Sequence, residues 1–145
     1  MNTTKALNCG LLISGLIAAG IGAAILVAPG PFYATYGIEL GGDASLLSEI
    51  RAPGGALLAL GLLMTSGAFV PALRFASTVV AAAVYLPYGL SRLLSMAIDG
   101  LPDTGLIGAA VLELAIGAAA LVAVRRQRHM DRNRFRPNQA DPVLP

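Results

Sequence analysis

No charged residue occurs between Ala6 and Ile38, and this long uncharged run is the feature that most limits how the chain can fold. A helix needs about 20 mostly apolar residues to cross the hydrocarbon core of a membrane. Three more apolar runs follow, separated by prolines and glycines, and proline cannot continue a helix. The runs predict four membrane-spanning helices, at about residues 6–28, 52–70, 75–98 and 104–124.

The composition leads to the same class of protein. Charged residues make up 12% of the 145 residues and hydrophobic residues 56%, whereas soluble domains carry roughly 25% charge. A soluble enzyme, a disordered chain and a nucleic-acid-binding domain therefore fit poorly. We expect an all-α four-helix membrane domain at residues 1–124 and a basic tail at residues 125–145. Two alternatives concern the segment before residue 52: the second helix begins near Ser45 and kinks at Pro53, or a separate amphipathic helix runs from Ser45 to Arg51 with Asp43 or Ser45 as its N-cap.

The distribution of basic residues predicts the orientation. Lys and Arg in short loops favour the cytoplasmic side, and six of the ten lie between Arg125 and Arg136. With both termini inside, Lys5 and Arg74 are cytoplasmic too, and the outer loops receive most of the acidic residues. We therefore expect a multi-pass protein of a bacterial inner membrane with cytoplasmic termini. The tail arginines expected to contact anionic lipids are Arg125, Arg126, Arg128, Arg132, Arg134 and Arg136.

Small residues recur at four-residue spacing on the first and fourth predicted helices. Rows of this kind let helix backbones approach closely within a membrane. The row residues are Gly10, Ser14, Ala18 and Gly22 on the first helix, and Gly105, Ala109 and Gly117 on the fourth. Two interpretations stay open: an interface with a membrane-protein partner or a second copy, or packing inside this chain's own bundle.

Two charged residues lie at membrane depth, Arg92 and Glu113. A charge at the centre of a spanning helix is unfavourable by roughly 2.5–3.5 kcal/mol, so both should face the bundle interior. Tyr85, Tyr88, Arg92 and Asp99 share one face of the third helix. The candidate polar group is Glu49, Arg51, Tyr85, Tyr88, Arg92, Asp99 and Glu113. Two interpretations stay open for this group. One is an outward-facing pocket that holds a polar head group or relays protons; the other is a buried network of ion pairs and hydrogen bonds that fixes helix register.

The run Glu49-Ile50-Arg51-Ala52-Pro53-Gly54-Gly55 carries a resemblance, together with Tyr88-Gly89-Leu90-Ser91-Arg92, Asp99-Gly100-Leu101-Pro102 and Glu113. These motifs resemble an uncharacterised family of small bacterial four-helix membrane proteins, a domain of unknown function with distant similarity to DoxX-like proteins. The resemblance covers roughly residues 6–124. It implies a four-helix fold and a shared set of polar residues, and no activity. Pro53 departs from the aromatic residue expected there.

The residue types that membrane chemistry requires are missing from the predicted helices. The single histidine, His129, lies in the tail and Cys9 is the single cysteine; haem ligation and disulfide chemistry need more than that. No phosphate-binding loop of the type GxxxxGK[ST] occurs. We therefore expect no enzyme activity, catalytic residue, metal, cofactor, nucleotide or nucleic acid. The expected function is an accessory or packing subunit of a larger membrane complex or oligomer; the alternative is a binder or carrier of a lipid or quinone.

Overall fold

The computed structural model describes residues 3–134, which are all-α and contain no strand. The elements are α1 (Thr3–Val27), α2 (Pro29–Ala34), α3 (Ala44–Phe69), the short 3-10 helix η1 (Pro71–Leu73), α4 (Arg74–Asp99) and α5 (Thr104–Arg134). Within the described chain, α1, α3, α4 and α5 are each long and apolar enough to cross a membrane. The predicted four-helix membrane fold is confirmed.

Two helix boundaries differ from the main prediction. Helix α3 begins at Ala44, near the alternative start, and Asp43 is its N-cap, accepting a 2.7 Å hydrogen bond from the Leu46 backbone N–H. Pro53 therefore lies inside α3. Helix α5 does not stop at residue 124 but continues to Arg134. The first part of the predicted tail is thus a helical extension of α5, and residues 135–145 lie outside the described range.

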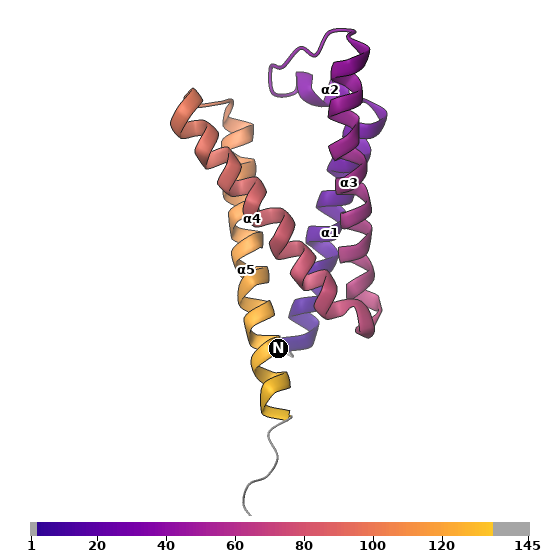
Figure 1. Ribbon diagram of the computed structural model, residues 1–145, viewed down its shortest axis with the longest axis vertical. Helices are drawn as coiled ribbons and strands as arrows, with labels where there is room; N and C mark the ends of the chain where they lie inside the picture. The colour runs from indigo at the N-terminus through magenta and orange to yellow at the C-terminus, as the bar shows by residue number, and fades with distance from the viewer. Residues whose placement is uncertain (1–2, 135–145) are drawn as a thin grey trace, which may run out of the picture.

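Short breaks turn the chain between the spanning helices. Pro29 opens α2 directly after α1, and Pro71 opens η1 after α3. Gly100 ends α4 with φ at 98°, a backbone conformation that glycine adopts without steric strain. Four crossings place the N-terminus and the C-terminal part of α5 at the same end of the molecule (Figure 1). We call this the terminal end, and the opposite end, which carries α2 and the α4–α5 turn, the loop end.

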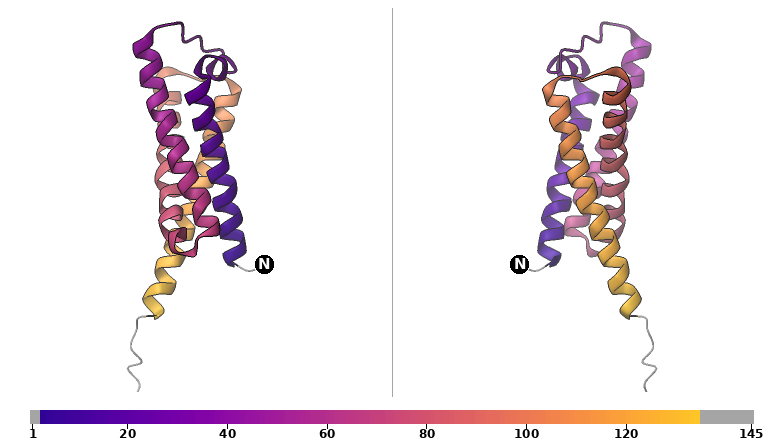
Figure 2. Two further views of the ribbon diagram at one scale, coloured as in Figure 1. Left: turned by 90° about the vertical axis from the view of Figure 1, so that its right-hand side faces the viewer. Right: turned by 90° about the vertical axis from the view of Figure 1, so that its left-hand side faces the viewer.

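The four long helices form two closely packed pairs, α1 with α3 and α4 with α5. Helix α4 also crosses α3, whereas α1 and α5 do not pack closely against each other in the described chain. Figure 1 shows the pairs lying close near the terminal end and diverging toward the loop end. The side views in Figure 2 show α5 reaching beyond the other helices at the terminal end.

Buried hydroxyl groups connect the two pairs. The Ser77 hydroxyl of α4 donates a 2.7 Å hydrogen bond to the Leu63 carbonyl of α3, and the Tyr85 hydroxyl of α4 donates a 2.6 Å bond to the Ser14 carbonyl of α1. Met64, which is fully buried, belongs to the apolar core of this region. The pairs are therefore joined by packing and by directional bonds, with α4 as the central helix.

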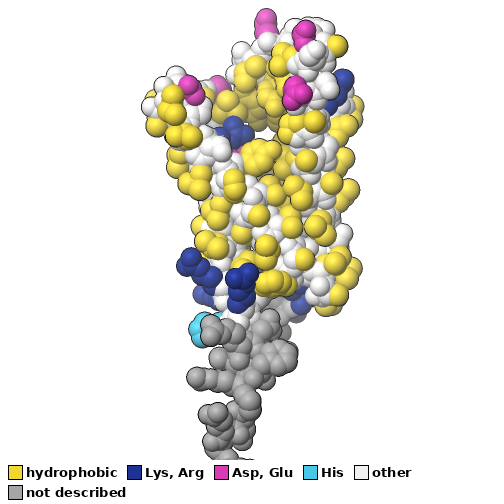
Figure 3. Space-filling model, viewed as in Figure 1, with side chains coloured by type: hydrophobic (Ala, Val, Ile, Leu, Met, Phe, Trp, Pro, Cys, Tyr) yellow, Lys and Arg dark blue, Asp and Glu magenta, His cyan; other side chains and the backbone are white. Residues whose placement is uncertain are grey.

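Charged side chains are separated along the long axis. On the face shown in Figure 3, acidic side chains gather at the loop end, basic side chains gather mainly at the terminal end, and a hydrophobic band lies between them. This is the surface expected of a helix bundle whose middle lies in lipid and whose ends reach water. All four long helices pass through this hydrophobic band, so most of the acidic and basic side chains lie near the ends of the helices.

Candidate functional site

An ion pair at membrane depth joins α4 to α5. Arg92 Nε donates a 2.9 Å hydrogen bond to Glu113 Oε2, and the two side chains are 32% and 13% exposed. Each charge would be unfavourable alone in lipid, and each supplies the opposite charge that the other needs. Both Asp99 and Glu113 were predicted members of the polar group that contains Arg92, and the structure pairs Arg92 with Glu113.

The two tyrosines on the same face of α4 lie in different surroundings. Tyr85 is buried, and its hydroxyl donates a hydrogen bond to the Ser14 carbonyl of α1. Tyr88 is 40% exposed and precedes Arg92 by one helical turn. The hydroxyl of Tyr85 therefore serves to hold α4 against α1, whereas the ring and hydroxyl of Tyr88 are accessible beside the ion pair.

The other predicted members of the polar group lie apart from this ion pair. Arg51 Nε donates a 3.2 Å hydrogen bond to the Leu26 carbonyl, near the C-terminus of α1. Asp99 accepts a 2.9 Å hydrogen bond from the Ser95 hydroxyl in the last turn of α4, and Glu49 is exposed. The structure thus shows separate interactions rather than one network that joins all seven residues. Sequence spacing places residues on a face but not next to a given neighbouring helix, so it could not show which of the seven residues bond to one another.

Most residues of the predicted small-residue rows pack against other helices of the same chain. A Cβ atom added at Gly22 would stand 2.7 Å from the Gly54 carbonyl oxygen of α3, and one added at Gly117 would stand 2.7 Å from Leu86 Cγ of α4. Ser14 and Ala18 are buried, Ala109 is half-buried, Gly105 lies beside Tyr36, and Gly10 has open space around it. The rows therefore include residues that serve packing within the chain.

Two of the three glycines with the tightest contacts between α1 and α3, Gly15 and Gly61, were missed, and only Gly22 was predicted. Gly15 and Gly61 approach so closely that a Cβ on Gly15 would stand 2.8 Å from the Gly61 carbonyl oxygen. Gly15 and Gly22 are seven residues apart, as are Gly54 and Gly61. This seven-residue spacing on both helices is the sequence signal that could have identified the contact.

The basic cluster begins while the chain is still helical. Arg125, Arg126 and Arg128 are exposed on α5, and the Arg128 guanidinium lies 5.9 Å from the centre of the Phe75 ring. Arg132 and Arg134 belong to the last turn of α5, whose side chains lie outside the described set, and Arg136 lies outside the described residues. The described arginines are thus displayed on a helix rather than on an extended tail.

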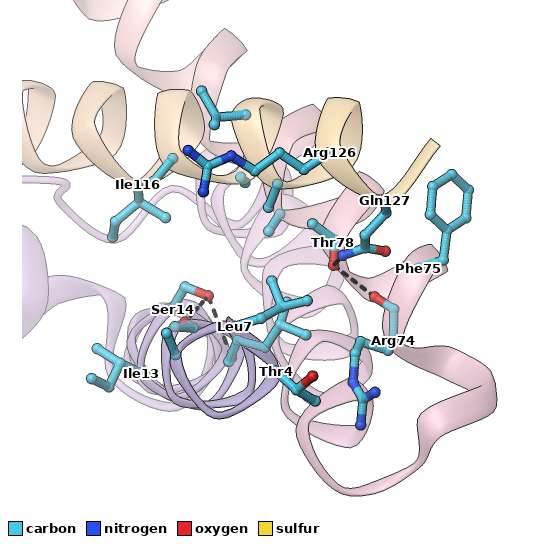
Figure 4. A pocket seen from close by; sticks show the side chains of 18 of the residues that line it. Thr4, Leu7, Ile13, Ser14, Arg74, Phe75, Thr78, Ile116, Arg126 and Gln127 are labelled. Atoms are coloured by element: carbon cyan, nitrogen blue, oxygen red, sulfur yellow. Dashed lines mark hydrogen bonds between the residues drawn. The ribbon is translucent and has the colours of Figure 1, made fainter. Parts of the chain in front are cut away.

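The large cavity lies at the terminal end, away from the Arg92–Glu113 ion pair. It has a volume of about 730 Å³ and is lined by α1, α4, α5 and Pro71. Apolar side chains such as Leu7 and Ile116 form its walls, and Arg74, Arg126 and Gln127 contribute polar groups (Figure 4). The sequence did not predict this cavity, because it arises from the gap between α1 and α5. Among the described residues, no group of three His, Cys, Asp or Glu side chains could hold a metal ion.

The fold and these sites define a small multi-pass membrane protein with four spanning helices and an intramembrane ion pair. Residues 6–124 match the family described as Domain of unknown function (DUF4345), and the chain belongs to that family. Neither the curated proteins nor the solved structures gave a match. The expected membership of an uncharacterised four-helix family is confirmed, while the bacterial source and the likeness to DoxX-like proteins stay predictions.

Proposed function

We propose that this chain is a non-catalytic membrane protein that acts as a packing or accessory subunit of a larger membrane complex or of an oligomer of its own copies. The observation that carries this proposal is the exposure of α5. Only 17% of its apolar stretch is buried within the chain, against 39% for α1. Helix α5 packs closely on α4 alone among the described helices. Its remaining surface is free to contact another membrane helix.

Small residues support close contact on that free surface. A Cβ atom added at Gly108 of α5 would meet nothing within 4 Å. Open glycines allow a partner backbone to approach, and van der Waals contact at short range is a main source of helix association in lipid. Gly22 is less useful as a probe of partners, because it belongs to the contact between α1 and α3.

The test compares two exposed glycines on different helices. Gly108→Leu should release a co-purifying partner, or convert an oligomer to a monomer, without lowering the melting temperature in mild detergent. Gly20→Leu is the matched control, because Gly20 also has open space but lies on α1. Native mass spectrometry of the three proteins gives the readout. A wild-type protein that is monomeric and without partners in native membrane extracts would contradict the proposal.

A second candidate function is binding or carrying a lipophilic molecule, such as a lipid or quinone, at the loop end. Tyr88 and Arg92 are both partly exposed there, beside Glu113. Figure 3 shows a notch between the two helix pairs at this end. A guest with a polar head group could bond to these side chains while its apolar part lies between the helices. Retention of a stoichiometric lipophile by wild type and its loss from Tyr88→Phe would favour this function over the subunit role.

We also propose that the protein lies in a bacterial inner membrane with its terminal end in the cytoplasm. Five described basic residues at the terminal end support this orientation, against Arg51 at the loop end; they are Lys5, Arg74, Arg125, Arg126 and Arg128. Reporter fusions after Lys5 and after Arg128 should report the cytoplasm, and a fusion at Gly41 should report the outside. A C-terminal fusion that reports the outside would overturn the orientation.

A further inference from the structure

The cavity at the terminal end combines an apolar groove with a basic mouth. Its walls come from Leu7 and Leu11 of α1, Phe75 of α4, and Ile116 and Ala120 of α5. Its volume of about 730 Å³ falls within the range of roughly 300–1,000 Å³ that ligand sites usually have. In a membrane such a groove between two helices opens to lipid, so its contents must be apolar along most of their length.

Two arginines from different helices line this cavity, and their side chains run in different directions. In Figure 4 the Arg126 side chain runs back along α5 toward Ile116, and the Arg74 side chain lies near Thr4 of α1. Arg74 Nε is buried, and no described residue accepts its N–H. No described carboxylate forms a salt bridge with either arginine. Both guanidinium groups therefore lack a counter-charge among the described side chains, at a place where the protein meets lipid.

Hydrogen bonds hold the walls of the mouth in position. The Thr78 hydroxyl donates a 2.7 Å bond to the Arg74 carbonyl and accepts a 3.2 Å bond from Gln127 Nε2. Thr78 is 1% exposed, so this link between α4 and α5 is protected from water. The position of Arg74 at the start of α4 is thus coupled to that of the α5 segment that carries Arg126.

We propose that this cavity binds one acidic phospholipid, with its headgroup at the part of the cavity that Arg74 and Arg126 line and an acyl chain in the groove between α1 and α5. A phosphate supplies the missing counter-charge and accepts several hydrogen bonds from guanidinium groups. An extended acidic peptide fits less well, because its backbone polar groups would enter the apolar groove unpaired. This site differs from the diffuse attraction of the basic tail to anionic membranes, since it needs a single lipid and the groove. It does not depend on the proposed subunit role.

The test uses the full-length protein in a nonionic detergent with dioleoyl phosphatidylglycerol or dioleoyl phosphatidylcholine, read by native mass spectrometry. We expect one phosphatidylglycerol per chain, bound roughly tenfold more tightly than phosphatidylcholine. Arg126→Gln should weaken phosphatidylglycerol binding about fivefold, because it removes one of the two positive charges that line the cavity. The matched control is Arg125→Gln, which removes the neighbouring exposed arginine that does not line the cavity and should change binding less than twofold.

A second variant tests the groove independently of charge. Ala119→Phe places a ring in the groove from an exposed position on α5, and it should remove the bound lipid while both arginines stay. Arg74→Gln repeats the charge test on α4; if it fails to fold, Arg126→Gln decides, because that side chain is exposed. Equal binding of the two lipids, equal losses in Arg125→Gln and Arg126→Gln, or full binding by Ala119→Phe would each overturn the proposal. A dimer that excludes lipid from the groove would overturn it too.

Discussion

The two helix pairs of this protein are held together in different ways. Between α1 and α3, glycines bring backbone against backbone, as at Gly15 and Gly61. Between α4 and α5, the atom nearest to each close-packed glycine belongs to a leucine side chain, as at Gly89 and Leu114, with the backbone slightly further away, and an ion pair joins Arg92 to Glu113. The close contacts of the first pair therefore leave little room for an added atom, whereas the contact between α4 and α5 depends more on the positions of side chains. Substitutions in the two pairs should fail for different physical reasons.

Breaking the ion pair should have the largest effect. Glu113→Ala or Arg92→Ala leaves one charge unpaired in a low-dielectric setting, which typically lowers the free energy of unfolding by about 3–5 kcal/mol. The double variant should lose less than the sum of the two single losses, because neither charge is then left alone. Denaturant or thermal unfolding in detergent measures the cycle. Asp99→Ala is the control, and fully additive losses would show that the two charges are independent.

The contrast between the pairs is tested by adding one methyl group to each. Gly61→Ala places a Cβ against the Ala19 N–H and 2.7 Å from the Gly15 carbonyl oxygen, which are backbone atoms that cannot rotate away. We expect a loss of about 1–3 kcal/mol, as for other overpacked sites.

Gly89→Ala is the matched change in the second pair. Its Cβ would stand 2.7 Å from Leu114 Cγ, a side-chain atom that can move, and 3.1 Å from the Leu114 backbone nitrogen, which is a less severe contact than those at Gly61. Displacing a side chain from its preferred rotamer costs about 0.5–1.5 kcal/mol. Both changes replace glycine by alanine within a helix, so the gain in helix propensity should largely cancel in the comparison. Equal melting temperatures for the two variants would remove the distinction between the pairs.

A smaller effect is expected where the pairs are linked to each other. Tyr85→Phe removes the hydroxyl that donates to the Ser14 carbonyl and keeps the ring. The loss of one hydrogen bond should lower the free energy of unfolding by about 0.5–1.5 kcal/mol. Tyr88→Phe, one turn further along α4, should leave stability unchanged. If the two tyrosine variants unfold alike, the bond between α4 and α1 contributes nothing to stability.

The smallest effect belongs to the exposed contact at the end of the first pair. Arg51→Gln removes a positive charge near the C-terminus of α1, where its Nε donates to the Leu26 carbonyl. Charges at helix ends contribute about 0.3–1 kcal/mol, and salt screens them. The difference in melting temperature between Arg51→Gln and wild type should therefore shrink as salt is added. A difference that grows with salt would rule out this explanation.

Part of the candidate site could be predicted from sequence because lipid penalises isolated charges. Arg92 and Glu113 both lie within apolar runs, so the interior of the bundle was the favourable place for both. Their pairing follows from the same penalty. The surroundings of Arg51 could not be predicted in this way, because they depend on the start of α3 lying beside the end of α1.

The sequence by itself determined the four spanning helices and their order, because each apolar run consists of residues close together in the chain. Partition into lipid acts on each apolar run almost independently of the others. Only the tertiary structure decided that α1 pairs with α3, that Gly15 and Gly61 are the close contacts, and that a cavity lies between α1 and α5. Hydropathy differs little from face to face on α1, α3 and α5, in contrast to α4, so on those three helices it does not distinguish the face that meets lipid from the face that meets a neighbour. Shape complementarity at close range makes that distinction, and it exists only once the helices are packed.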